Sequence, residues 1–366
     1  MIRLEQVTKL YGDKTAVKDL SLHVDDNQVC VLIGPSGCGK TTTLRMINRL
    51  VEPTSGRILF ESNDIESLKP DLLRRNIGYA IQSVGLFPHM TVGANIGTVP
   101  DLLGWDKARI ASRVTELLDL VGLPQDYAGK YPNQLSGGEA QRIGVARALA
   151  ADPPVLLMDE PFGAVDPLTR ERLQGQFLRI QEELKKTIIL VTHDLDEAIR
   201  LADRIAIMSA GELVQYDTPE EILAKPANKF VHDFVGTDRA LKRLSRIGIG
   251  PLVKEAPGVS ITAPIEDART TCEGCRWVWV SDERDRLIGW LDMYNLKSAA
   301  SVRDAVVRVD MNEIAVTQTA TLREALSRIL GQGLKAIPVV DDDGKLCGEI
   351  DLGSIEKATA EARSQP

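Results

Sequence analysis

Short apolar runs alternate with helical patterns through the first 240 residues. Four runs rich in β-branched residues are bounded by turn or charged residues and lie at 29–33, 155–158, 188–191 and 205–208. Such runs are typical of strands buried on both faces of a parallel sheet. Helical periodicity lies between them, at 41–50, 108–121, 138–151, 167–185 and 194–202. The alternation predicts an α/β domain with a mostly parallel sheet, while 2–7 and 16–24 alternate differently and predict an antiparallel subsheet.

The pattern changes near residue 237, where a polar and basic stretch predicts a linker. Beyond it, residues 278–292 align with 337–351 at a constant offset of 59 positions. The identical pairs are Val280 and Val339, Asp282 and Asp341, Leu287 and Leu346, Gly289 and Gly348, and Asp292 and Asp351. Each copy predicts a strand, an acidic turn, a second strand entered through glycine, and a helix. Matches without a gap favour two packed copies of one small α/β unit over a chance similarity of two hairpins.

These patterns predict a first domain at 1–236, a linker at 237–250 and a second domain at 251–366, with repeats at about 251–300 and 305–360. The length of 366 residues agrees with two or three domains. With 43% hydrophobic and 26% charged residues, the chain can bury a core, which excludes disorder as its main theme. No apolar run approaches the ~18 residues that span a bilayer, and the N-terminus lacks the pattern of a signal peptide, so we expect neither.

The charge balance bears on the partners. Lys and Arg number 44 against 52 Asp and Glu, which gives a formal net charge of −8. Proteins that bind nucleic acid through its phosphates carry a basic surplus. We therefore expect no nucleic acid as the main partner, although the composition leaves a local basic patch open.

The five cysteines are scattered and odd in number. This distribution favours reduced thiols over a disulfide framework. Cys272 and Cys275 have the CxxC spacing of a metal site, but no second pair follows them. We favour two thiols without such a role over a zinc or redox site.

The strongest chemical motif follows the apolar run at 29–33. It fits the phosphate-loop pattern GxxxxGK[ST] and consists of Gly34, Pro35, Ser36, Gly37, Cys38, Gly39, Lys40 and Thr41, with Thr42 next. Glycines let backbone N–H groups turn inward and form an anion-binding nest, and the positive end of the following helix faces the same phosphates. Lys40 would contact the β- and γ-phosphates, and the Thr41 hydroxyl would bind Mg²⁺.

A second motif ends the apolar run at 155–158 with Asp159 and Glu160. Acids at the carboxyl end of a buried strand lie at the edge of the sheet where ligands bind. We expect Asp159 to hold the metal through water and Glu160 to accept a proton from the attacking water. A strand that merely leaves the core is the alternative, and the phosphate loop makes it the weaker one.

A third motif, Ser136, Gly137 and Gly138 before a helical pattern, predicts a second phosphate cradle. Taken alone, it is a common loop. Its meaning depends on the motifs around it.

Together these motifs resemble the nucleotide-binding subunit of ABC transporters over roughly residues 1–236. The phosphate loop resembles the Walker A motif, 135–139 the signature and 155–160 the Walker B strand. Further positions match the family's Q-loop glutamine, switch histidine, adenine-stacking aromatic and D-loop aspartate, which are Gln82, His193, Tyr11 and Asp166. The resemblance implies a P-loop NTPase core with an antiparallel β subsheet and a helical subdomain.

The resemblance also implies roles and partners. It assigns ATP binding to the phosphate loop and Tyr11; Mg²⁺ to Thr41, Gln82 and Asp159; and catalysis to Glu160, His193 and Gln82. In this family two copies enclose two ATP molecules head to tail, so Ser136 and Gly138 would complete the partner copy's site. Gly137 and Asp166 are also expected to bind the nucleotide. Glu139 stands where Gln is frequent, and 163–166 read Gly-Ala-Val-Asp where Ser-Ala-Leu-Asp is common.

The subtype follows from what the chain contains. It has one cassette, no fused membrane span, and only 96 positions between Lys40 and Ser136, which favours an importer subunit over exporters, repair ATPases and translation factors. Residues 81–96 resemble importers of glycine betaine, choline, carnitine and proline betaine. The resemblance implies permease subunits, an extracytoplasmic substrate-binding protein, and a peripheral place on the cytoplasmic face of the cell (inner) membrane. Phe87 and Pro88 are candidates for the permease contact, with local loop packing equally open.

The repeat resembles the tandem CBS pair, an α/β module, that these importers commonly carry. The pattern departs from nucleotide-binding CBS domains, because Asp292 and Asp351 replace the hydroxyl residue and Asn295 and Ser354 replace the ribose-binding Asp. An acid near a phosphate repels it, so AMP or ATP is disfavoured there. A regulatory module that senses ionic strength or a cyclic dinucleotide, and a purely structural dimerisation module, both stay open. An importer of amino acids or sulfonates, and a soluble ATP-driven regulator, are the alternative functions.

Overall fold

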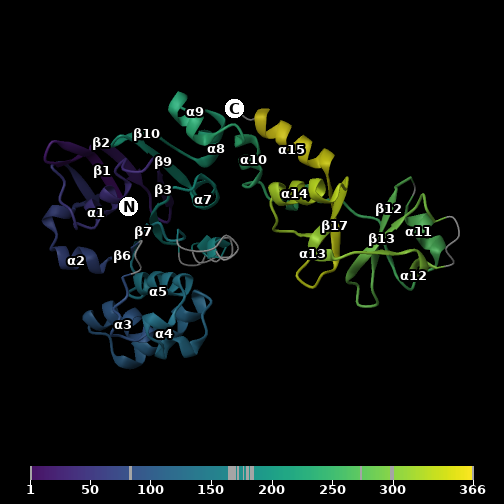
Figure 1. Cartoon of the computed structure of the whole chain (residues 1–366), viewed down its shortest axis with the longest axis horizontal. Coiled ribbons are helices and arrows are strands. Elements are labelled where there is room, and N and C mark those ends of the chain that lie inside the picture. Colours follow the sequence, from purple (N-terminus) through teal and green to yellow (C-terminus); the bar gives the residue numbers. More distant parts are fainter. Residues whose placement is uncertain are drawn as a thin grey trace. The chain divides into compact units, whose positions relative to one another are not determined.

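The computed structural model describes residues 2–81, 85–163, 170, 173–175, 177–178, 181, 185–272, 274–296 and 301–364. It divides into two compact units, Met1–Thr237 and Asp238–Pro366 (Figure 1). Each unit has its own sheets and hydrophobic clusters.

The first unit is built on two sheets. In the described part of the chain, a six-stranded sheet has the order β10-β9-β3-β8-β7-β6 and is parallel except for the β9–β10 pair. Its strands are β3 (Val29–Ile33), β6 (Ile77–Ala80), β7 (Val155–Asp159), β8 (Thr187–Val191), β9 (Arg204–Ser209) and β10 (Glu212–Asp217). An antiparallel sheet of order β2-β1-β4-β5 contains β1 (Ile2–Tyr11), β2 (Lys14–Val24), β4 (Ser55–Phe60) and β5 (Asn63–Asp64). The predicted parallel sheet and antiparallel subsheet are both confirmed.

The parallel sheet separates two hydrophobic clusters. Alternate residues point to opposite faces of a strand, so Cys30 and Leu32 pack with the antiparallel sheet, whereas Val31 and Ile33 pack with helices on the other side. Strands β3, β7 and β8 are buried at every position. This burial explains their continuous apolar runs.

The described helices of the first unit are α1 (Lys40–Ile47), α2 (Pro70–Arg75), α3 (Val92–Leu102), α4 (Lys107–Leu120), α5 (Gly137–Leu149), α7 (Leu195–Leu201), α8 (Pro219–Ala224) and α9 (Lys229–Val235). Helices α1, α4, α5 and α7 begin within one residue of the predicted positions, whereas α2, α3, α8 and α9 were not predicted. Short 3₁₀ segments lie at Ile65–Ser67, Gln125–Gly129 and Pro132–Gln134. Helices α3, α4 and α5 pack together as the helical subdomain (Figure 1). Much of the helix predicted at 167–185 lies outside the described residues.

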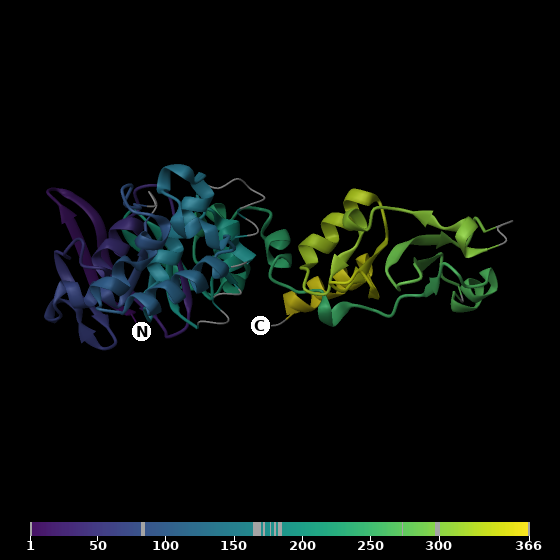
Figure 2. The same ribbon diagram turned by 90° about the horizontal axis from the view of Figure 1, so that it is seen from below.

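The second unit holds the two repeats. Its strands are β11 (Gly258–Ser260), β12 (Trp277–Ser281), β13 (Leu287–Asp292), β14 (Val307–Arg308), β15 (Val316–Thr317), β16 (Ala336–Val340) and β17 (Leu346–Asp351). Its helices are α10 (Arg239–Leu244), α11 (Ile265–Thr271), α12 (Val302–Ala305), α13 (Met311–Ile314), α14 (Leu322–Gln332) and α15 (Leu352–Ser364), with a 3₁₀ turn at Gly250–Leu252. Figure 2 shows both copies, the first in green and the second in yellow-green to yellow.

The two hairpins share one register. Trp277 pairs with Asp292 as Ala336 pairs with Asp351, and both hairpins carry a bulge at the same place, so the offset of 59 holds residue by residue. The hairpins meet where Leu287 N donates to Gly344 O at 2.9 Å. Two packed copies of one unit are therefore present.

One expected element differs. The second copy continues from β17 into α15, but the first copy turns after β13, where Asp292 accepts hydrogen bonds from Tyr294 N and Asn295 Nδ2. No helix follows over 293–296. The helix predicted after the first hairpin is present as α12, but it begins only at Val302, whereas α15 begins directly after β17.

The segment at 237–250, expected to be a linker, is folded. It contains α10, which packs against α14, and it buries Leu244 and Ile249 in the cluster around β16 and β17. The chain from Asp238 onward belongs to the second unit. The basic side chains of this segment are not simply solvated, because Lys242 is only 13% exposed and pairs with Asp238 at 3.1 Å.

The expectation of reduced thiols at the CxxC pair is wrong. Cys272 and Cys275 form a disulfide, with their Cα atoms 5.2 Å apart. Cys30, Cys38 and Cys347 are free. Among the described residues no group of three or more His, Cys, Asp or Glu could hold a metal, so the zinc alternative has no support there.

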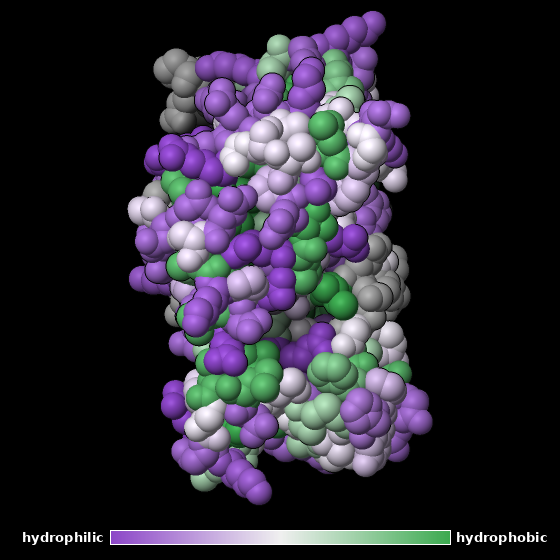
Figure 3. All heavy atoms as spheres, turned by 90° about the vertical axis from the view of Figure 1, so that its left-hand side faces the viewer, coloured by the Kyte–Doolittle hydropathy of each residue, from purple (hydrophilic) through white to green (hydrophobic). Residues whose placement is uncertain are grey.

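None of the helices in the described part of the chain is long and apolar enough to cross a bilayer. The face in Figure 3 is mostly hydrophilic, and its hydrophobic groups form separate patches.

Candidate functional site

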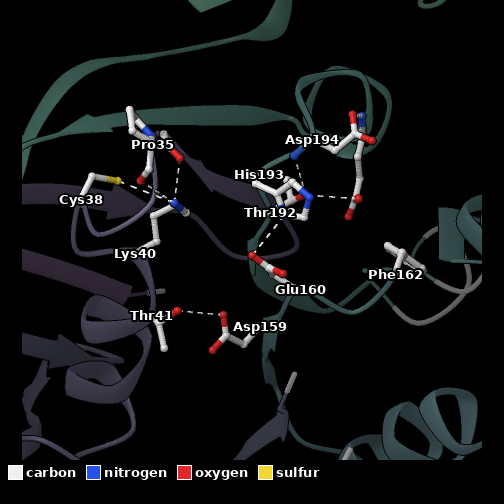
Figure 4. A network of polar contacts seen from close by, with 12 residues as sticks. Pro35, Cys38, Lys40, Thr41, Asp159, Glu160, Phe162, Thr192, His193 and Asp194 are labelled. Atoms are coloured by element: carbon white, nitrogen blue, oxygen red, sulfur yellow. Dashed lines mark hydrogen bonds and ion pairs between the residues drawn. The ribbon is translucent and has the colours of Figure 1, made fainter. Parts of the chain in front are cut away.

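The site lies where three neighbouring parallel strands end. The phosphate loop follows β3, Asp159 ends β7, and His193 comes two residues after β8. The carboxyl ends of parallel strands lie at one edge of the sheet. Three segments far apart in the sequence therefore meet there (Figure 4).

Two glycines of the phosphate loop are required by close backbone contacts. A Cβ on Gly34 (φ 153°) would lie 2.1 Å from Met208 O, and one on Gly39 (φ 104°) would lie 2.5 Å from Ala16 O. Pro35, Ser36 and Gly37 are exposed between them, whereas Cys38 is buried. The loop therefore presents its tip to solvent while both ends are fixed by neighbouring strands.

Lys40 folds back onto this loop. Its Nζ donates to Gly34 O at 2.7 Å and to Pro35 O at 3.1 Å, and the side chain is buried (Figure 4). A carbonyl group is neutral and attracts an ammonium group only through its dipole. Phosphate oxygens bind it more strongly because they carry full charge.

Thr41 and Asp159 form an oxygen pair. Thr41 Oγ1 donates to Asp159 Oδ1 at 3.0 Å, and Asp159 is only 4% exposed. Burial raises the pKa of this carboxyl, an effect that the Thr41 hydrogen bond opposes. A surface cavity is lined by both residues together with Arg45, Tyr79 and Ile81.

This pair fits Mg²⁺, because the ion prefers one or two carboxylate or hydroxyl oxygens and completes its shell with water and phosphate. The hydroxyl and carboxylate face each other across one hydrogen bond at the cavity wall. A bound ion would neutralise phosphate charge there.

The backbone of Glu160 is fixed by two hydrogen bonds. Its backbone takes a positive φ of 48°, its N–H donates to Val191 O at 2.9 Å, and Gln141 Nε2 donates to its carbonyl at 3.1 Å. Its Oε1 lies 3.1 Å from His193 Nδ1, with the His193 side chain 68% exposed (Figure 4). A fixed carboxylate beside an exposed imidazole is suited to accept a proton from water.

A buried acid supports the His193 segment. Thr192 Oγ1 donates to Glu197 Oε2 at 3.2 Å and accepts from Asp194 N at 3.0 Å, so both neighbours of His193 are tied to α7. Burial raises the pKa of Glu197 to about 7, and none of the described residues hydrogen-bonds its Oε1. Asp194 also caps α7 by accepting from Asp196 N and Glu197 N.

The signature residues begin α5. Ser136 is the N-cap of this helix, and Gly137 and Gly138 are its first two residues. Ser136 and Gly137 are exposed. A helix N-terminus with exposed N–H groups can bind an anion, here one presented from outside the unit.

Tyr11 ends β1 and is 49% exposed, with Lys9 Nζ 5.1 Å from the centre of its ring. The same hairpin contacts the phosphate loop through Ala16. Gln82 and Asp166 lie outside the described residues.

Two residues of this network were missed by sequence reasoning. Gln141 connects α5 to the carbonyl of Glu160, and Glu197 connects α7 to Thr192. Both are buried polar residues on helices that read as ordinary amphipathic segments. For Glu197, the one available signal was an acidic residue directly before the apolar residues Ala198 and Ile199.

Comparisons with known proteins agree with this geometry. The ABC transporter family profile matches residues 17–163, and the CBS domain profile matches 302–361. The carnitine transport ATP-binding protein OpuCA of Listeria monocytogenes is 48% identical over 364 aligned residues, covering 97% of this chain and 91% of that protein. The chain belongs to the family of ABC transporter ATP-binding subunits.

A second relative also matches this ABC subunit along its whole length, and a solved structure matches its first unit. The osmoprotectant import ATP-binding protein OsmV of Salmonella typhimurium is 45% identical and covers 100% of this chain and 98% of that protein. The dimeric ATP-binding cassette MJ0796 with ADP and Pi matches with a TM-score of 0.56 at 33% identity, covering 60% of this chain and 99% of that one. The resemblance to ABC ATPases with a C-terminal CBS region is confirmed, and so is the P-loop fold. This ABC subunit binds ATP.

Proposed function

We propose that this subunit hydrolyses Mg²⁺-ATP between two copies of itself and thereby powers import of quaternary ammonium osmoprotectants. The observation that carries the proposal is the convergence of the phosphate loop, the Thr41–Asp159 pair and the Glu160–His193 pair at three strand ends. This edge contains a phosphate cradle, an oxygen pair for the ion and a base for water.

Each side chain has a defined task in this proposal. Lys40 leaves the carbonyls of its own loop and binds the β- and γ-phosphates, with Tyr11 against the adenine. Glu160 accepts the proton of the attacking water, and His193 contacts the γ-phosphate. Ser136, Gly137 and Gly138 of the second copy close over the same phosphate, and Gln82 and Asp166 take the roles that the family resemblance implies.

The variant Glu160→Gln tests the chemistry. The amide keeps the size of the side chain but accepts no proton, so ATP binding persists while steady-state hydrolysis falls by about 10²-fold or more. We expect Mg²⁺-ATP to trap a dimer of this variant, visible by sedimentation. Unchanged turnover would refute Glu160 as the base.

The proposed permease contact lies beside Phe87. Phe87 N donates to Asn95 Oδ1 at 2.7 Å and Asn95 Nδ2 donates back to Phe87 O at 3.1 Å, so a fully buried amide fixes the backbone. The ring is nevertheless 42% exposed and lines a groove with Arg74, Tyr79 and Arg147. A fixed loop that exposes an aromatic ring is suited to receive a short helix from another protein.

The variant Phe87→Ala tests this contact. We expect copurification with the permease subunits to fall about tenfold, while ATP affinity is unchanged. His89→Ala serves as the matched control, because it removes a neighbouring ring whose backbone is not bonded by the Asn95 side chain. Equal copurification of Phe87→Ala and the unaltered chain would exclude this contact.

The names of the relatives support the proposed cargo, because they specify carnitine, choline, glycine betaine and osmoprotectants. We place the subunit on the cytoplasmic face of the cell membrane, with permease subunits and an extracytoplasmic binding protein completing the importer. Uptake of labelled glycine betaine by cells that carry the full importer should be lost with Lys40→Ala. If uptake of an amino acid or a sulfonate is lost instead, the cargo assignment is wrong.

A further inference from the structure

The signature serine is already occupied by a carboxylate of its own helix. Ser136 N donates to Glu139 Oε2 at 2.7 Å, and Ser136 Oγ donates to the same oxygen at 2.9 Å. Glu139 N in turn lies 3.4 Å from Ser136 Oγ. Both hydrogen-bond donors of Ser136 are therefore satisfied within one copy.

The other oxygen of Glu139 is fixed by a separate segment. Tyr127 OH donates to Glu139 Oε1 at 2.7 Å, and Tyr127 packs against the main hydrophobic cluster with Lys130 over its ring. These hydrogen bonds, with that from Tyr127 the largest, lower the pKa of Glu139 to about 2. Arg142, one turn further along α5, acts in the same direction. The carboxylate thus keeps its negative charge at any physiological pH.

A hydroxyl group has one proton to donate. When a phosphate from the second copy approaches, Ser136 can donate to that phosphate or to Glu139, and the carboxylate repels the phosphate at the same time. We propose that Glu139 is a positioning residue that competes with the partner copy's terminal phosphate for Ser136 and so raises the ATP concentration at which two copies close. This inference rests on the proposed ATP-enclosing dimer.

An ordinary capping box is the structural alternative, because a Glu at the third helical position often bonds the N-cap. A glutamine forms the same box, since its carbonyl oxygen accepts both bonds from Ser136. The charge is therefore what distinguishes the two roles.

The test uses the full chain carrying Glu160→Gln, with dimer formation followed by sedimentation as Mg²⁺-ATP is added. Adding Glu139→Gln should lower the half-saturating ATP concentration about threefold or more at low salt, and the difference should shrink at about 1 M salt because the charge is screened. Asp126→Asn removes one exposed charge next to Tyr127 and should shift the midpoint by less than about 1.5-fold. Thermal unfolding of all variants checks folding.

Glu139→Ala gives a second way to separate the roles. It removes the charge and the cap together, so competition predicts a lower half-saturating concentration and capping predicts a higher one. An unchanged or raised midpoint for Glu139→Gln, with the parent dimerising normally, overturns the competition alone. Failure of the parent to dimerise at saturating Mg²⁺-ATP overturns the proposed function, and the inference with it.

Discussion

Both units place aspartates at the ends of strands, but the hydrogen bonds of these aspartates differ. Within the described residues Asp159, at the end of β7, receives one hydrogen bond, from Thr41, and burial raises the pKa of Asp159. Asp351 at the end of β17 receives three, from Ser354 N, Ser354 Oγ and Lys254 Nζ, at 2.6, 2.8 and 2.7 Å. The first carboxylate retains capacity for a ligand, whereas the second already holds its own turn together.

A binding site and a structural cap at the end of a strand therefore differ in how fully the polar groups are bonded within the chain. At the strand ends of the first unit, some charged side chains have only weakly attracting partners. Lys40, for example, donates to neutral carbonyl oxygens. In the second unit Asp292 closes a turn and Asp351 caps the start of α15.

The largest effect should come from Lys40→Ala. Removing the ammonium group should weaken ATP affinity by about 10²-fold or more, because it eliminates the full charge that faces the phosphates. The matched variant in the second unit, Asp351→Asn, should leave ATP affinity within about twofold. Calorimetry with Mg²⁺-ATP measures both, and a large loss with Asp351→Asn would break the comparison.

The next effect concerns the packing of the second unit. A Cβ on Gly348 would lie 2.4 Å from Lys254 O, so Gly348→Ala should destabilise this unit by about 2–4 kcal/mol. Gly344 also has a positive φ, of 79°, but open space around it, and Gly344→Ala should cost about 1 kcal/mol. Hydrogen exchange of the β16 and β17 amides measures the difference. Equal protection in the two variants would contradict it.

A smaller effect should appear in the pH dependence of the first unit. Because the pKa of Glu197 is about 7 in the folded chain and its ordinary value is 4.5, the folded chain binds the proton more tightly. Its contribution to stability is therefore complete below about pH 4.5 and is lost as pH rises through about 7. Glu197→Gln should remove about 1–3 kcal/mol of this dependence between pH 5 and 8. Denaturant unfolding at both pH values tests it, and parallel pH profiles for the two chains would rule it out.

The smallest effect should come from the contact between the two repeats. Trp279 Nε1 donates to Glu349 Oε2 at 2.8 Å across the two hairpins. Trp279→Phe keeps most of the buried ring but loses this bond, which should destabilise the second unit by about 1 kcal/mol. The exposed Tyr294→Phe is the control and should change nothing measurable. A change in ATP affinity with Trp279→Phe would show that the units are not separate in this respect.

The sequence by itself determined the parts of this protein that depend on local pattern. The buried strands were predicted because a strand covered on both faces needs an unbroken apolar run, and the phosphate loop because glycines at fixed spacing allow only a few backbone paths. The two hairpins followed from an offset that the register preserves residue by residue.

The tertiary structure alone decided how distant side chains meet. The contacts of Gln141 with Glu160, of Glu197 with Thr192 and of Tyr127 with Glu139 join segments that the sequence pattern does not connect. The two residues of each pair lie on separate elements. Such choices are made by packing, because a polar side chain bonds whichever group the fold places within about 3 Å of it.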